Sequence, residues 1–133
     1  MRDLIVSEFV TLDGRIEAPG GEPTHAHAGW TMEHGVPEFY AFKYREVVEA
    51  ESLLLGRTTF EGFAAAWSQR DGEFAERMNA MPKHVASTTL GSDPGWNATV
   101  LEGDVPAAVS RLKQEDGGPL LLAGSAALAQ TML

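Results

Sequence analysis

The sequence contains no cysteine, and this absence excludes several classes of protein. Without thiols there is no disulfide scaffold, no thiolate zinc site and no cysteine nucleophile. No apolar run approaches the ~20 residues that span a bilayer, and no signal peptide is recognised at the start. Basic residues are few, 10 against 19 acidic ones, which gives a formal net charge of −9. We therefore expect neither nucleic acid nor a membrane as a partner, although a local cationic pocket for one anionic cofactor stays open.

The composition is typical of one globular domain. Of the 133 residues, 44% are hydrophobic and 22% are charged. A chain of this size buries roughly two thirds of its unfolded surface, so it forms a core without covalent staples. We expect a single cytoplasmic domain that spans residues 1–133.

Apolar runs and helical patterns alternate along the chain. Strands are predicted at residues 3–10, 52–55, 83–87, 98–101 and 120–123, and helices at 36–50, 60–67, 73–81, 105–115 and from 126 onward. The stretch 17–35 is polar and rich in glycine, proline and histidine, which predicts a long loop. This alternation predicts an α/β sheet with helices on its faces.

Two segments share one plan, in which an apolar strand is followed by a glycine and by small hydroxylated residues that open a helix. They are LLLGRTTF at 53–60 and LLLAGSAAL at 120–128. Glycine lets a ligand approach the backbone, and a helix N-terminus presents unpaired N–H groups with a partial positive charge. Thr58, Thr59 and Ser125 add hydroxyl donors, and Arg57 adds a guanidinium that matches a phosphate. The pattern predicts an anion site, although turns and helix caps use the same residues.

Other polar residues offer weaker signals. His25, His27 and His34 would suit a metal-binding protein, but no matching carboxylate or histidine stands at helical spacing. We therefore expect solvated loop histidines and no metal site. The acidic residues Glu46, Glu49 and Glu51 are interpreted as the solvated side and end of a helix.

Four segments occur in the order seen in one superfamily. They are SEFVTLDGRIEAPGG, LLLGRTTFEGFAAAW, KHVAST and LLLAGSAALAQTML. With them the chain resembles the C-terminal reductase domain of the bifunctional riboflavin-biosynthesis deaminase–reductase, and its stand-alone relatives. The resemblance implies the dihydrofolate-reductase fold, with three α/β/α layers around a mostly parallel sheet. It also implies NADPH-dependent hydride transfer to a small heterocyclic, carbonyl or imine substrate, similar to 5-amino-6-(5-phosphoribosylamino)uracil reductase or dihydrofolate reductase.

The resemblance also implies where a cofactor and a substrate would bind. The phosphate end would be lined by Gly56, Arg57, Thr58 and Thr59, with Arg57 beside the 2′-phosphate. The adenosine side would contact Ser87, Thr88 and Thr89, the pyrophosphate would contact Gly124 and Ser125, and the nicotinamide would lie beside Val10, Leu12 and Gly14. Asp13 is the nearest carboxyl to that ring and is predicted as the proton donor. Selectivity for the substrate is expected from Trp30, Phe39 and Phe42.

Relatives of this family normally continue with further strands, so ending at Leu133 would leave an edge strand unpaired. We expect either that C-terminal strands are missing here or that the substrate half is altered. The unfinished edge predicts a homodimer. The alternative to a reductase is a non-catalytic module of the same fold that binds a nucleotide or serves as an association surface.

Overall fold

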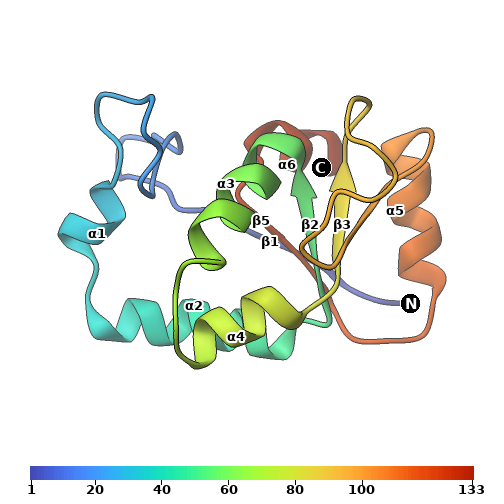
Figure 1. The fold of residues 1–133 in the computed structure, drawn as a ribbon, viewed down its shortest axis with the longest axis horizontal. Coiled ribbons are helices and arrows are strands. Elements are labelled where there is room, and N and C mark those ends of the chain that lie inside the picture. The colour runs from blue at the N-terminus through green and yellow to red at the C-terminus, as the bar shows by residue number, and fades with distance from the viewer.

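All strands of the central sheet run parallel. In the computed structural model, which describes residues 1–133, five strands pair in the order β1-β5-β2-β3-β4 (Figure 1). Their bounds are β1 (Leu4–Ser7), β2 (Ser52–Gly56), β3 (Lys83–Ala86), β4 (Ala98–Val100) and β5 (Leu120–Ala123). The predicted α/β class with a parallel sheet is confirmed.

Helices cover both faces of this sheet. The helices of the chain are α1 (Trp30–His34), α2 (Pro37–Glu49), α3 (Arg57–Trp67), α4 (Glu73–Ala80), α5 (Val105–Gln114) and α6 (Ala126–Met132), and those from α2 to α6 pack on the sheet. One core cluster joins Val47, Phe60 and Met78 of α2, α3 and α4 to one face, and a second joins Val109 and Leu128 of α5 and α6 to the other. The molecule therefore has the expected three layers. None of these helices is long and apolar enough to cross a bilayer.

The two wholly apolar runs form the middle of the sheet. Leu53, Leu54 and Leu55 of β2 have no exposed surface, and the facing leucines of β5 are at most 1% exposed. Successive side chains of a strand point to opposite faces, so a strand covered by helices on both faces needs apolar residues throughout. Each fully buried leucine contributes roughly 2–3 kcal/mol to folding.

Some element boundaries differ from the prediction. β1 ends at Ser7 and not at residue 10, because Ser7 pairs with Ala123, the last residue of its only partner strand. α3 begins at Arg57 and not at residue 60, with Gly56 extended as its N-cap. The predicted loop 17–35 contains the five-residue helix α1, which is too short to produce a periodic apolar pattern.

The chain leaves β1 and β5 toward opposite faces. The segment after β1 leads to α2 on one face, whereas β5 leads directly to α6 on the other. Open α/β sheets bind ligands where neighbouring connections diverge in this way, at the carboxyl ends of the strands. Figure 1 shows the segment between β1 and α2 as a lobe beside the sheet, on the left. β1 is an edge strand, and its Ile5 and Val6 are 40% and 37% exposed. The homodimer expected from the sequence stays a prediction.

Candidate functional site

The two glycine-containing junctions predicted to bind an anion lie against each other at the carboxyl edge. The backbone N–H of Gly56 donates a hydrogen bond of 2.8 Å to Oγ of Ser125. Gly124 has a φ of +65°, and a Cβ there would lie 3.0 Å from Cγ2 of Thr59. Glycine is therefore required at position 124 for its backbone conformation and for its close approach to α3. The structure joins the two sequence segments into one site.

The N-terminus of α3 supplies open hydrogen-bond donors. Gly56 is the N-cap, and no side chain caps the helix. Thr58 and Thr59 were expected just before the helix, but they lie in its first turn, where their backbone N–H groups have no intrahelical acceptor. Such N–H groups and the helix dipole favour an anion, so this end of the sheet can hold a phosphate.

Ser125 holds the second junction in place. Its φ of 61° is in the left-handed region, which a residue with a side chain rarely adopts. Its hydroxyl oxygen accepts the Gly56 N–H and does not cap α6. The hydroxyl hydrogen can still be donated to a ligand. Ser125 therefore positions the Gly56 turn and keeps one donor.

Arg57 and the loop after β3 meet at the neighbouring strand end. The Arg57 guanidinium donates through Nη1 to Oγ1 of Thr89, and its Nε lies 2.9 Å from Oε1 of Glu61. The Oγ of Ser87 accepts the backbone N–H of Thr89 at 3.2 Å, which orders this loop. Thr88 is exposed beside it. The structure thus brings together Arg57 and the 87–89 loop, which the resemblance assigned to the same end of the cofactor.

The residues assigned to the nicotinamide edge lie on the lobe after β1. Val10 is 60% exposed, Leu12 is fully exposed, and nothing stands within 4 Å of the place where a Cβ on Gly14 would lie. Their role beside a nicotinamide stays a prediction.

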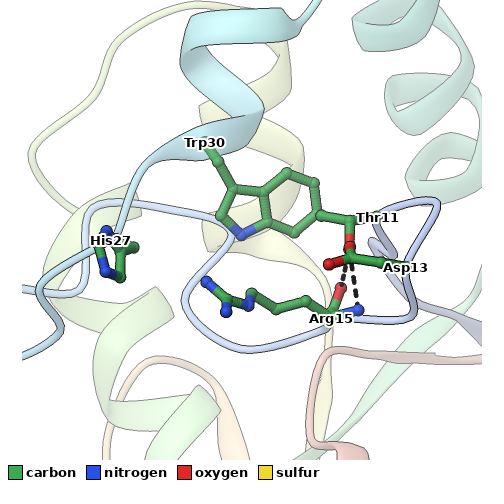
Figure 2. A pocket seen from close by; sticks show the side chains of 5 residues that line it. All are labelled: Thr11, Asp13, Arg15, His27 and Trp30. Carbon is green, nitrogen blue, oxygen red and sulfur yellow. Dashed lines mark hydrogen bonds between the residues drawn. The ribbon is translucent and has the colours of Figure 1, made fainter.

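Asp13 and Trp30, predicted for catalysis and for substrate binding, line one cavity of about 260 Å³ together with Thr11, Arg15 and His27. Figure 2 shows Thr11 and Asp13 at one end, His27 at the other, and Trp30 and Arg15 between them. The indole N–H of Trp30 donates to the Glu17 carbonyl at 3.0 Å.

Asp13 has the electrostatics of an ionised carboxylate. It is exposed, and the hydrogen bond from the Thr11 hydroxyl is the largest cause that lowers its pKa below the usual value. A general acid needs a pKa close to the working pH. The predicted donor role of Asp13 therefore receives no support from its environment, whereas binding a ligand N–H or O–H group would suit it.

The three residues predicted to select a substrate are not brought together. Neither Phe39 nor Phe42 lines the cavity of Trp30. The Phe39 ring packs 5.2 Å from that of Phe9, next to the end of β1. Phe42 is 49% exposed on α2, with the Arg45 guanidinium 5.9 Å from its ring centroid.

A polar cluster at the end of β1 was not predicted from the sequence. Nζ of Lys43 donates to Oγ of Ser7 at 2.5 Å and lies 2.5 Å from Oε2 of Glu46, and the Ser7 hydroxyl donates to Oε1 of Glu46 at 2.8 Å. Lys43 and Glu46 are only 15% and 17% exposed, so Glu46 is not on the solvated side of its helix as expected. The only feature of the sequence that could have indicated this cluster is that Lys43 and Glu46 lie among the apolar residues of α2, near Val47. Glu8 follows Ser7, and one of its carboxylate oxygens is buried without a hydrogen-bond partner.

The histidines form no site of three ligands. The ring centroids of His25 and His27 are 6.2 Å apart. Nε2 of His34 lies 3.9 Å from Oε2 of Glu33. No group of three or more histidine, aspartate or glutamate side chains is arranged to hold a metal ion.

The parallel sheet and its three layers are consistent with the dihydrofolate-reductase-like class of proteins. The chain belongs to the RibD C-terminal domain family, whose model matches residues 2–133. This is a family of reductase-type domains of riboflavin biosynthesis. The expected family and fold are thereby confirmed over essentially the whole chain. A comparison with curated proteins finds no match.

Proposed function

We propose that this chain binds NADPH along the carboxyl edge of its sheet and reduces a C=N or C=O group of a small heterocyclic substrate. The observation that carries the proposal is the grouping of Arg57, the 87–89 loop and the uncapped N-terminus of α3 beside the turn at Gly124. The two glycine junctions were predicted from the residues to bind an anion, and the 87–89 loop was assigned to the cofactor by the family resemblance. Their meeting at the strand ends supports a dinucleotide with an extra phosphate.

The donors present fit such a cofactor. The 2′-phosphate would pair with the Arg57 guanidinium, which is half-exposed. The pyrophosphate would accept the first-turn N–H groups of α3 and face the turn at Gly124, which packs closely against Thr59 of that first turn. When bound, NADPH supplies the hydride, and the protein's task is to bind, orient and exclude water.

Glu61 modulates the Arg57 site. Its carboxylate pairs with Arg57 one helical turn away, and both side chains are about half exposed. Exposed pairs of this kind contribute about 0.3–0.5 kcal/mol, much less than a charge-assisted bond to phosphate. A bound 2′-phosphate can therefore displace Glu61 at little cost.

The test is a fluorescence titration of the wild-type chain and Arg57→Ala with NADPH and NADH. Loss of a charge-assisted contact worth about 1.5–3 kcal/mol should weaken NADPH about 10- to 100-fold and leave NADH nearly unchanged. Arg70→Ala is the matched control, because Arg70 is exposed and stacks on Trp67, 4.6 Å from its ring centroid. Equal weakening of both cofactors, or no binding of either by the wild type, would contradict the proposal.

Turnover is measured by the absorbance of NADPH with pterins, flavin precursors and small carbonyl compounds as probes. We expect NADPH oxidation with at least one of these compounds. Tight NADPH binding without oxidation by any of them would favour the non-catalytic nucleotide-binding module.

A further inference from the structure

The reduction of a C=N or C=O group needs a proton as well as a hydride, and the exposed, ionised Asp13 is poorly suited to supply it. We propose that Glu8 is the proton donor of this site and that Lys43 is a positioning residue beside it. This inference depends on the proposed reductase function. It is carried by the location of Glu8, the burial of one of its carboxyl oxygens and the contacts of Lys43.

Glu8 lies at the topological switch point of the sheet. β1 and β5 pair in parallel with Ser7 opposite Ala123, so the next residues, Glu8 and Gly124, leave the two strands side by side. Neighbouring strands are about 4.8 Å apart, which puts the Glu8 backbone close to the glycine turn of the proposed cofactor site. The loops diverge from here to opposite faces, where open α/β sheets bind their ligands.

The carboxyl group of Glu8 is in an environment that favours its neutral form. Its Oε1 is buried and has no hydrogen-bond partner. A buried carboxylate without donors pays a large desolvation cost, which is avoided by holding a proton. Burial accordingly raises the pKa of Glu8 above the ordinary value of 4.5. Glu8 therefore retains a proton at a pH where Asp13 has lost its own.

Lys43 balances this effect without bonding to Glu8. Its ammonium is engaged by Ser7 and Glu46, each at 2.5 Å, so it is fixed in place. From there its charge favours the ionised form of Glu8 and lowers the pKa, in opposition to burial. The end of β5 and the start of α6, residues 123–126, carry no titratable side chain. A carboxylate formed at Glu8 thus faces a fixed cation once the proton has left.

The proposed step balances in atoms and electrons. The carbon of the C=N or C=O group gains a hydride, and its π electron pair moves to the nitrogen or oxygen. That atom takes the proton from the Glu8 carboxyl, whose O–H bond breaks. Glu8 is left as a carboxylate, the nicotinamide is left oxidised, and water returns the proton to Glu8 before the next turnover.

The first test needs neither cofactor nor substrate. The carboxyl ¹³C signal of Glu8 is assigned by its loss in Glu8→Gln. Its titration should give a pKa above 4.5, and Lys43→Met should raise that pKa further. The folded state binds this proton more tightly than the unfolded state, so wild-type stability should fall relative to Glu8→Gln as pH rises through the Glu8 pKa. Glu49→Gln, on the exposed side of α2, is the matched control for the loss of one carboxylate. A measured pKa of Glu8 at or below 4.5 would overturn the proposal.

The second test uses the probe that the wild type reduces fastest. Glu8→Gln should slow hydride transfer in a single turnover about 10²- to 10⁴-fold with NADPH affinity unchanged, and Glu8→Asp should restore part of the rate. The wild-type rate should fall as pH rises through the Glu8 pKa, and Glu8→Gln should lose this dependence. If Glu8→Gln is as fast as the wild type, the donor assignment fails and the reductase function stands. If the wild type binds NADPH but reduces no probe, the reductase function fails and the donor assignment falls with it.

Discussion

Gly124 is the position at which one added methyl group tests how the two strand–helix junctions meet. In Gly124→Ala the new Cβ would lie 3.0 Å from Cγ2 and 3.4 Å from Oγ1 of Thr59, and the backbone would have to keep a φ of +65°. The variant therefore combines backbone strain with a steric overlap. A matched control is Gly103→Ala, because Gly103 has a φ of +75° and no atom within 4 Å of the added Cβ.

The expected magnitudes follow from these two geometries. The left-handed conformation costs alanine roughly 1–2 kcal/mol in both variants. Both also gain about 0.4–1 kcal/mol because alanine reduces the freedom of the unfolded chain, so this effect cancels between them. Relieving the overlap forces Thr59 away from its rotamer at a cost of about 0.5–1.5 kcal/mol. We expect Gly124→Ala to be less stable than Gly103→Ala by about 1 kcal/mol, which is the overlap alone.

Urea denaturation of the single and double variants measures this difference. Thr59→Ser removes the Cγ2 methyl group, so the double variant Gly124→Ala/Thr59→Ser should recover most of the overlap energy, a coupling of about 1 kcal/mol. The recovery should be absent when Thr59→Ser is combined with Gly103→Ala. If Gly124→Ala and Thr59→Ser are additive, or if Gly103→Ala is equally destabilised, the close approach of α3 to the β5 turn does not exist as described.

Two further predictions concern buried charges away from the site. Lys83 is 1% exposed, its Nζ donates to the Asn79 carbonyl at 3.0 Å, and burial lowers its pKa to about 8. In the unfolded chain the lysine has its ordinary pKa of 10.5, so between about pH 8 and 10.5 only the unfolded state holds the proton. Wild-type stability, measured by urea denaturation, should therefore rise relative to Lys83→Met over this pH range, by up to ~3 kcal/mol. A difference in stability that does not change with pH would contradict this account. Arg2 is 5% exposed and donates to the Gly118 carbonyl at 2.8 Å. Arg2→Met should cost about 2 kcal/mol in the same assay without changing NADPH affinity, and a neutral effect would contradict this account.

The core of the fold could be predicted because local patterns carry it. The leucine runs of β2 and β5 are buried on both faces, and such strands are apolar at every position. The helix at 105–115 was predicted closely for a local reason, since Asp104 caps it by accepting the Ala107 N–H at 3.0 Å. β1 was overpredicted because its length depends on its partner. Nothing within residues 3–10 records that β5 ends opposite Ser7.

The sequence by itself determined the α/β class and the two glycine junctions, since both depend on residue types at short spacing, and the family could be named from the resemblance of four segments in their order along the chain. The tertiary structure decided which distant residues meet. Arg57 contacts Thr89, and Gly56 bonds to Ser125, because the parallel order of strands brings their carboxyl ends to one edge. Likewise, no local pattern distinguishes the partly buried, unpartnered Glu8 from the exposed Asp13. That difference arises from burial, and burial is a property of packing.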